Sequence, residues 1–361
     1  MMTVVFVFFC LCSTLGRSAR AHMQPLARRG FLGNVVALTV PAAVAAEDTA
    51  VADGVYRPAK ESMRGKMVVI TGANTGLGLE SCVRLAEAGA TVMGTARTVE
   101  KLKKMESAVR ERCPDALFEG ALLDLGSLES IDKFPKQLKK RKIDVLLLNA
   151  GQMAIPEERR TVDGVERQIG VNFLGHYALT ATLVPFFKES IRVISVSSSA
   201  NFGATRKDLE AAIESDDLSL PKYSQWGSYC VSKAMNILFA AELQRKFNEN
   251  LKGASAVSLH PGVIATDLAR YLINGPDATP TDPKATPGFL LKALSFFVLP
   301  VDQGANTQVF LAANDDQKAL YYDNMKPAKP NKLALDPDLG ARLFQRAKSI
   351  SGKSFDFETL Q

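Results

Sequence analysis

Apolar and polar residues alternate in a regular order along residues 66–262. Short apolar, β-branched runs at 67–71, 91–97, 115–125, 143–151, 192–200 and 255–262 predict strands. Segments with helical spacing of apolar residues, such as 79–88, separate these runs. Strands that alternate with helices predict an α/β protein with a single doubly wound parallel sheet and helices on both of its faces.

Residues 1–46 follow a different pattern, which indicates a targeting leader. Residues 3–12 form an apolar run of signal-peptide length that is too short to span a bilayer. Arg28 and Arg29 then precede a weakly hydrophobic stretch that ends in the A-x-A cleavage pattern of residues 43–45. This arrangement resembles a twin-arginine export signal placed behind a secretory signal, as in the multipart leaders of some algal plastid proteins. We therefore expect the plastid, with the thylakoid included, and keep the secretory pathway or ER as the alternative.

The net charge changes this picture little. The 361 residues carry a formal net charge of +6, but residues 1–46 contain four arginines and no acidic residue. The rest of the chain is close to neutral and has no block of like charges, which argues against nucleic acid as a partner.

The cysteines and the three histidines show no metal-ligand spacing, so we expect no metal site.

A glycine-rich turn, TGANTGLG at residues 71–78, lies between the first predicted strand and the first predicted helix. Glycine lets the backbone approach a pyrophosphate closely, and the helix N-terminus presents free N–H groups to the anion. In this strand–turn–helix setting the pattern predicts dinucleotide binding and a Rossmann-type sheet, with a purely structural turn as the alternative. The predicted contacts are Gly72, Asn74, Thr75, Gly76, Leu77 and Gly78.

The end of the second predicted strand indicates which dinucleotide binds. An NAD enzyme usually carries an acidic residue there for the ribose 2′-hydroxyl, whereas this chain has Ala96 followed by Arg97. An arginine pairs well with a 2′-phosphate, so we expect NADP(H), with a solvated strand-end charge as the alternative. The further cofactor contacts that we expect, at the adenine and along the end of the fourth strand, are Asp124, Leu125, Asn149, Ala150 and Gly151.

The segment YCVSK contains a candidate proton donor. Hydride transfer to a ketone leaves an alkoxide that needs a proton, and Tyr229 can supply one. The ordinary pKa of tyrosine, about 10, is too high for efficient transfer at neutral pH. Lys233 stands four residues later, on the same face of a helix, and we expect its cation to lower that pKa.

Taken together, these segments resemble the short-chain dehydrogenase/reductase family. The matching pieces are TGANTGLG, LLLNAG, VNFLGHYALT, VISVSSSA, YCVSK and HPGVIATDL, in the order of that family, over most of residues 64–312. The resemblance implies that Lys233 also binds the nicotinamide ribose and that Ser198 hydrogen-bonds the substrate oxygen. It implies that Asn172 holds a water molecule that relays protons to the lysine. The nicotinamide contacts that it implies are Pro261, Gly262, Val263 and Thr266.

Three consecutive serines make the position of the substrate-binding hydroxyl a separate question. Alignment of VISVSS with the family pattern selects Ser198, and Ser197 and Ser199 are the alternatives. We expect His260 to be structural, because the tyrosine–lysine pair already supplies the proton.

Two longer segments resemble one branch of the family. The insert DDLSLPKYSQWGSY and the tail YYDNMKPAKPNKLALDPDLGARLFQRAKSI are similar to retinol dehydrogenases and WW-domain oxidoreductases. Light-dependent protochlorophyllide reductase is a neighbour with a poorer match. The chain departs from the branch at Phe173, where histidine is frequent, which leaves the substrate-side contacts open.

The expected function is NADP(H)-dependent interconversion of an apolar alcohol and its aldehyde or ketone, with Tyr229 as general acid/base. A retinol-, isoprenoid- or pigment-like substrate fits this branch. The alternatives are a protochlorophyllide reductase-like pigment reductase and a non-catalytic dinucleotide-sensing protein on the same fold. A sensor would need none of the four predicted catalytic side chains, which favours the enzyme.

The expected organisation is a leader (1–46), a linker (47–62), one dinucleotide-binding catalytic domain (63–352) and a tail (353–361). The apolar stretch 287–300 lies where this fold places a substrate lid, near 270–300. A buried lid helix is one interpretation, and contact with a membrane or a lipid-like substrate is the other. Besides an apolar small-molecule substrate, a peripheral membrane contact and a homodimer stay open as partners.

Overall fold

The computed structural model describes residues 51–264, 299–315 and 319–360. Contacts within residues 50–361 gather that part of the chain into one compact unit. The predicted leader, the first residues of the predicted linker, nearly all of the predicted lid and Thr266 lie outside the described residues.

The centre of this unit is an eight-stranded sheet in the order β10-β9-β8-β7-β6-β3-β4-β5. All neighbouring strands pair in parallel except β10, which pairs antiparallel with β9. This arrangement confirms the predicted Rossmann-type, doubly wound sheet. The strands are β3 (Met67–Ile70), β4 (Thr91–Ala96), β5 (Phe118–Leu122), β6 (Ile143–Leu148), β7 (Phe187–Val196), β8 (Ser255–His260), β9 (Tyr321–Asp323) and β10 (Lys326–Pro327).

The sequence pattern missed two parts of this sheet. Strand β7 begins at Phe187, before the predicted run, because the polar residues 188–190 conceal its start. Strands β9 and β10 contain three and two residues, too few to show a period. Tyr321 and Tyr322 of β9 are buried because they pair with β8.

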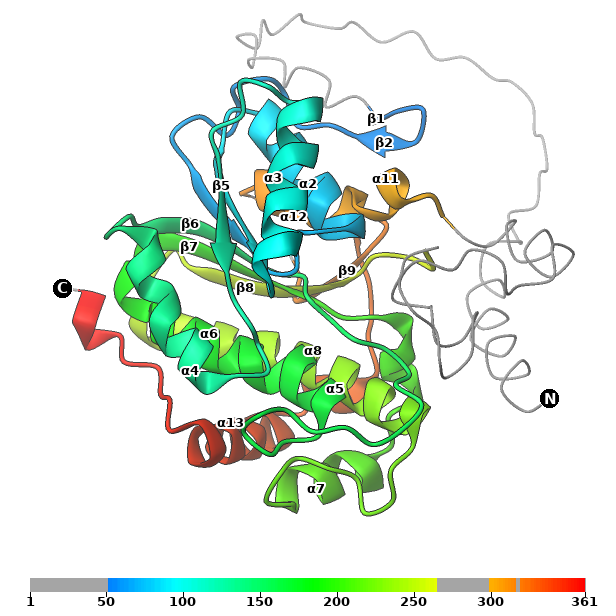
Figure 1. Ribbon diagram of the computed structural model, residues 1–361. Coiled ribbons are helices and arrows are strands. Elements are labelled where there is room, and N and C mark those ends of the chain that lie inside the picture. Colours follow the sequence, from blue (N-terminus) through cyan, green and yellow to red (C-terminus); the bar gives the residue numbers. More distant parts are fainter. Residues whose placement is uncertain (1–50, 265–298, 316–318, 361) are drawn as a thin grey trace, which may run out of the picture. The chain divides into compact units, whose positions relative to one another are not determined.

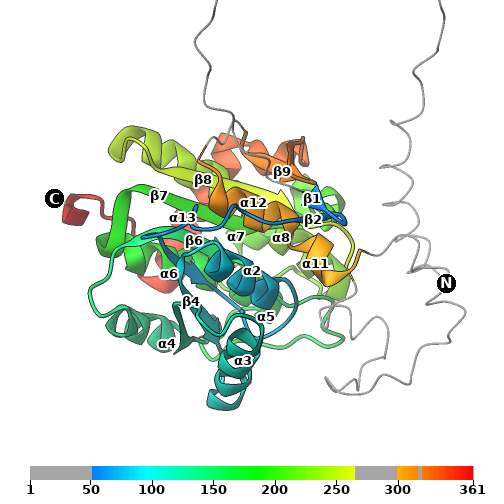
Figure 2. The ribbon, with the colours of Figure 1, turned by 90° about the horizontal axis from the view of Figure 1, so that it is seen from above.

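Helices cover both faces of the sheet (Figures 1 and 2). On one face lie α2 (Gly76–Glu87), α3 (Val99–Arg112), α11 (Val301–Gly304) and α12 (Asn306–Ala313). On the other lie α4 (Leu128–Lys133), α5 (Arg167–Ile169), α6 (Gly175–Leu183), α7 (Arg206–Glu214), α8 (Gln225–Asn250) and α13 (Pro337–Ser351). Shorter helical turns are η1 (Phe134–Leu138), η2 (Gly170–Leu174), η3 (Val184–Phe186), η4 (Ser199–Gly203), η6 (Lys332–Leu335) and η7 (Glu358–Leu360). A separate two-stranded sheet consists of β1 (Val51–Ala52) and β2 (Val55–Tyr56).

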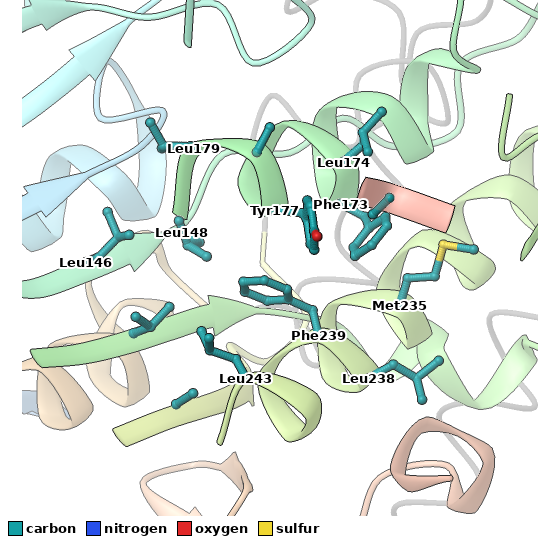
Figure 3. Close-up of a cluster of buried hydrophobic side chains, with 14 of the residues drawn as sticks. Leu146, Leu148, Phe173, Leu174, Tyr177, Leu179, Met235, Leu238, Phe239 and Leu243 are labelled. Atoms are coloured by element: carbon teal, nitrogen blue, oxygen red, sulfur yellow. The ribbon is translucent and has the colours of Figure 1, made fainter. Parts of the chain in front are cut away.

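Each face of the sheet packs against its helices through a cluster of buried apolar side chains. Figure 3 shows part of the cluster beneath α8, where Phe173, Tyr177 and Phe239 meet. The ring centre of Phe173 lies 6.2 Å from that of Tyr177 and 6.4 Å from that of Phe239. The position at which the chain departs from its expected branch is therefore a core position.

The same packing explains one apolar stretch. Residues 167–186 have the length and mean hydropathy of a membrane span, but 83% of the most apolar window is buried inside the protein. This stretch includes α6, which packs against α4 and the core cluster. Burial against other elements accounts for its composition.

The strand order places two chain segments beside one crevice. Strands β3 and β6 are neighbours, although β4 and β5 lie between them in the sequence. The chain therefore changes direction between β3 and β6, and such a switch point opens a crevice at the carboxyl ends of the strands. The glycine-rich turn follows β3, and Asn149 follows β6.

Candidate active site

The glycine-rich turn leaves no room for side chains. Gly72 has a φ of +63°, and a Cβ there would lie 2.8 Å from the Ala150 Cα atom. A Cβ on Gly78 would lie 2.5 Å from the Gly72 carbonyl oxygen and 2.6 Å from Asn149 Nδ2. Because Gly72 and Gly78 carry no side chains, a ligand can lie directly against the backbone of the turn.

The N-terminus of α2 fits an anion. Its N-cap residue, Thr75, makes no side-chain capping bond, and the first turn contains no acidic residue. The first backbone N–H groups of α2 consequently have no capping partner, and the helix dipole adds positive potential. The turn and the helix together fit the pyrophosphate of a dinucleotide.

Asn149 holds the turn against the neighbouring strand. Its Nδ2 group donates to the Thr71 oxygen at 2.9 Å and to the Gly72 oxygen at 3.1 Å. Gln308 Nε2 lies 3.3 Å from Asn149 Oδ1 and donates to Ser81 Oγ at 2.7 Å. Asn149 thus holds the backbone of the turn by hydrogen bonds. Gln308 of α12, which sequence reasoning missed, hydrogen-bonds to Asn149.

The remaining predicted cofactor contacts occupy different settings. Arg97 is exposed directly after β4 and has no hydrogen bond or ion pair with any described residue. Asp124 accepts a bond from Gly126 N at 2.9 Å, so its carboxylate faces its own loop. Leu125 is buried in the apolar core. Of these residues, only Arg97 offers a charge that has no partner within the described ranges.

Tyr229, Ser198 and Lys233 come together from two elements. Tyr229 and Lys233 lie on α8, and each is only 3% exposed. Ser198, the N-cap residue of η4 just after β7, lies near enough to the Tyr229 hydroxyl to favour its ionised form. Lys233 Nζ lies 5.7 Å from the centre of the Tyr229 ring and donates to the Val196 oxygen at 3.0 Å.

The protonation of this group differs from the sequence-based expectation. Burial raises the pKa of Tyr229 well above its ordinary value, and the interaction with Ser198 lowers it only in part. The Tyr229 pKa of the free protein is thus raised and not lowered as expected, because the effect of burial outweighs the effects that favour the phenolate. Burial also lowers the pKa of Lys233 to about 8. Tyr229 therefore stays protonated at neutral pH, which is the form that donates a proton.

The three serines have three different roles. Ser197 is buried, and its Oγ donates to the Lys233 oxygen at 2.7 Å. Ser199 N donates to His260 Nδ1 at 3.1 Å. Ser198 is the member of the run whose side chain affects the pKa of Tyr229, so its selection over Ser197 and Ser199 stays a prediction. His260 contacts the serine loop.

Asn172 lies in η2, a π-helical turn, and is fully buried. Its Nδ2 group donates to the Gln152 oxygen at 2.9 Å and to Ser232 Oγ at 3.0 Å, while Oδ1 accepts from Gln152 N at 2.7 Å. Both amide protons are therefore used within the protein. A relay water would need the oxygen atoms of Asn172. A Cβ on Gly151 would be 3.5 Å from both Asn172 Oδ1 and Lys233 Nζ, so these two atoms border the same space.

His176 links Asn172 to the dinucleotide side of the site. His176 Nδ1 donates to the Asn172 oxygen at 2.9 Å, and its Nε2 lies 2.9 Å from Thr71 Oγ1. Since Nδ1 of the neutral ring carries the proton, Nε2 accepts from the Thr71 hydroxyl, whose oxygen in turn accepts from Ala150 N at 3.0 Å. Burial lowers the pKa of His176 to about 4. Sequence reasoning missed this neutral bridge, although its spacing of four residues from Asn172 was the available signal.

Three of the four predicted nicotinamide contacts, all in the loop after β8, lie in the described part of the chain. Pro261 and Gly262 are half-buried and Val263 is exposed. Leu299 N donates to the Val263 oxygen at 2.7 Å, which ties the loop to the chain before α11. The remaining residue, Thr266, lies outside the described residues.

Comparisons with known proteins agree with this geometry. A family model described as short chain dehydrogenase matches residues 66–206. Retinol dehydrogenase 13 of Homo sapiens is 32% identical over 305 residues, which cover 82% of this chain and 87% of that protein. The WW domain-containing oxidoreductase of Drosophila melanogaster is 30% identical over 309 residues, with 80% and 69% covered. A solved structure of an uncharacterized protein from Mycobacterium paratuberculosis has a TM-score of 0.64 at 29% identity, with 83% of this chain and 99% of that chain covered.

Proposed function

The chain belongs to the short-chain dehydrogenase/reductase family and is an oxidoreductase related to the retinol dehydrogenases, and from this premise we propose that it interconverts an apolar alcohol and its aldehyde or ketone with NADP(H). Proteins of this family use a nicotinamide dinucleotide. The observation that carries the proposal is the group formed by the buried Tyr229 and Lys233 and the partly buried Ser198, in a chain whose glycine-rich turn fits a pyrophosphate.

In the proposed mechanism, the chain's own side chains bind the substrate oxygen and move one proton. The bound dinucleotide supplies the hydride for reduction or accepts it for oxidation. The hydroxyls of Ser198 and Tyr229, which interact with each other in the free protein, hold the carbonyl oxygen. Tyr229 donates its proton to the oxygen as the alcohol forms. Lys233, whose pKa of about 8 keeps it mostly charged at neutral pH, stabilises the phenolate that remains.

The preference for NADP(H) rests on Arg97. It follows β4 at the place where a ribose 2′-hydroxyl or 2′-phosphate reaches the sheet edge in this fold. Its guanidinium is exposed and has no bond to any described residue. A free guanidinium forms charge-assisted bonds with a phosphate, and Ala96 before it offers no carboxylate for a hydroxyl.

The preference for an apolar substrate has two supports. The names of related proteins, such as retinol dehydrogenase 13, point to an isoprenoid alcohol. In addition, Trp226 stacks on the Tyr229 ring, with ring centres 5.5 Å apart and planes inclined by 27°. This aromatic surface borders the proton donor and favours an apolar or conjugated substrate over a charged one.

For the first 46 residues we keep the proposal of plastid targeting. Its supports are the apolar run, the arginine pair and the A-x-A pattern. A fluorescent fusion of residues 1–60, expressed in an alga with the matching import route, should enter the plastid. Retention of the fusion in the cytosol would contradict the proposal.

The test of the proposed activity is consumption of NADPH by the purified protein with retinal and, for comparison, with a short polar aldehyde. We expect turnover with retinal that exceeds turnover with the polar aldehyde. Absence of turnover with every apolar carbonyl compound, together with tight binding of NADPH, would favour the dinucleotide sensor instead.

A further inference from the structure

A buried asparagine fixes the backbone of the serine that faces Tyr229. Asn201 lies in η4, three residues after Ser198, and is fully buried. Its backbone N–H donates to the Ser198 oxygen at 3.0 Å, and its Nδ2 group donates to the same oxygen at 2.6 Å. Two donors on one carbonyl restrict the orientation of the peptide that carries the Ser198 hydroxyl.

Asn201 is itself held by the C-terminal part of the chain. Asn331, which is 130 residues away in the sequence, donates from its backbone N–H to Asn201 Oδ1 at 2.9 Å. Its Nδ2 group donates to the Asn201 oxygen at 3.0 Å and to the Ala204 oxygen at 3.0 Å. Tyr321 of β9 also interacts with the Asn201 side chain. The described contacts of Asn201 thus join the serine loop to the segment between β10 and η6 and to β9.

Asn331 also caps η6, and a suitable substitution can separate this role from its bonds to Asn201 and Ala204. Its Oδ1 atom accepts from Leu333 N at 3.1 Å and caps η6. The two bonds to Asn201 and Ala204 use the amide protons instead. An aspartate keeps the cap and loses both donors, because an ionised carboxylate only accepts hydrogen bonds.

From these contacts we propose that Asn331 and Asn201 are positioning residues that align Ser198 with Tyr229, so that the segment between β10 and η6 forms part of the active site. This inference rests on the proposed function of Ser198. A displaced Ser198 hydroxyl would bind the substrate oxygen poorly and would weaken its interaction with Tyr229. Since that interaction lowers the pKa of Tyr229, its loss should raise this pKa further.

The kinetic test compares Asn331→Asp and Asn331→Ala with Lys332→Ala, which changes the adjacent exposed residue. We expect both Asn331 variants to lose about tenfold in kcat while the KM for NADPH is retained, and Lys332→Ala to match the unmodified protein. The alkaline limb of the oxidation pH profile should move to higher pH in both Asn331 variants. A fully active Asn331→Asp would mean that Asn331 only caps η6, and the inference would be wrong.

Combination with Ser198→Ala gives a second kinetic criterion. If Asn331 acts through Ser198, then Asn331→Asp should change kcat by less than about twofold once the serine hydroxyl is absent. A loss in the double variant equal to the product of the single losses would overturn the inference, because it would mean that Asn331 acts independently of the serine.

Hydrogen exchange separates the failure of this inference from failure of the proposed activity. In Asn331→Asp the amides of residues 197–204 should exchange faster than in the unmodified protein, whereas those of residues 76–87 should not change. Unchanged exchange in 197–204 would refute the inference even if the enzyme is active. Faster exchange in a protein without any turnover would refute the proposed function of Ser198 and leave the structural link intact.

Discussion

Two buried cations, Arg84 in α2 and Lys233 in α8, are surrounded very differently. Arg84 is 1% exposed and bonds to Glu80 Oε1 at 2.8 Å, the Tyr56 oxygen at 3.0 Å, Asn306 Oδ1 at 2.9 Å and the Asp302 oxygen. Lys233 is 3% exposed, and among the described residues its one hydrogen-bond acceptor is the Val196 oxygen.

These different surroundings have different effects on the pKa values at the two sites. Burial alone would raise the pKa of Glu80, but its bonds to Arg112 and Arg84 hold that pKa below the ordinary value, so the pair stays charged. Lys233 has no carboxylate partner among the described residues, and burial lowers its pKa to about 8. A buried charge with all its partners stabilises a fold, whereas one with few partners keeps donors for a ligand. The first cation is structural, and the second belongs to the candidate site.

The largest expected effect concerns the partner of Lys233. Tyr229→Phe removes the proton donor but keeps the ring, so turnover should fall by about 10²–10⁴-fold while NADPH binding survives. Steady-state kinetics and fluorescence titration with NADPH measure the two quantities. Tyr177→Phe is the matched control, because its buried hydroxyl bonds to the Lys353 oxygen at 3.2 Å, away from the site. Near-normal turnover of Tyr229→Phe would show that the tyrosine–lysine pair is structural.

Replacement of each cation by methionine tests the comparison directly. Arg84→Met should lower the free energy of unfolding by about 3 kcal/mol, because it leaves Glu80 and three oxygen acceptors buried with fewer partners. Lys233→Met should change it by less than about 1 kcal/mol, since a poorly paired buried charge is removed. Urea denaturation of both variants decides between these outcomes. Equal destabilisation would mean that Lys233 is held as firmly as Arg84.

His176 provides an intermediate case, a buried group that is tolerated because it is neutral. Its pKa of about 4 lies below the ordinary value of 6.5, so between these values the unfolded chain binds a proton that the folded protein does not. The free energy of unfolding should therefore fall as the pH is lowered from 6.5 to 4, by about 3 kcal/mol from this group. Denaturation at several pH values should show a shallower fall in His176→Gln. An identical fall in both proteins would indicate that other groups cause the acid sensitivity.

Arg97 completes the series as an exposed cation without a described partner. Arg97→Ala should weaken NADPH binding by about 1.5–3 kcal/mol, because a charge-assisted bond to the 2′-phosphate is lost. NADH binding should hardly change. Arg110→Ala, which removes another exposed arginine of the same region, serves as the control. If the unmodified protein binds both dinucleotides equally, the preference for NADP(H) is wrong.

Local patterns along the chain were sufficient for much of the fold and for naming some candidate site residues. The parallel strands, the glycine-rich turn and the pair Tyr229 and Lys233 each depend on residues within one turn or one short element. Periodicity and spacing carry that information, because side chains close in sequence take fixed relative positions on a strand or a helix. The order of these segments was likewise enough to indicate the family.

Only the tertiary structure decided how the site is held and charged. The direction of the Tyr229 pKa shift, the bridge from His176 to Thr71 and the support of Asn201 by Asn331 join segments that are far apart in the sequence. The short strand β9 exists because it pairs with β8, not because of its own pattern. Burial and hydrogen bonding depend on which distant segments pack together, and residue spacing within one segment does not determine those contacts.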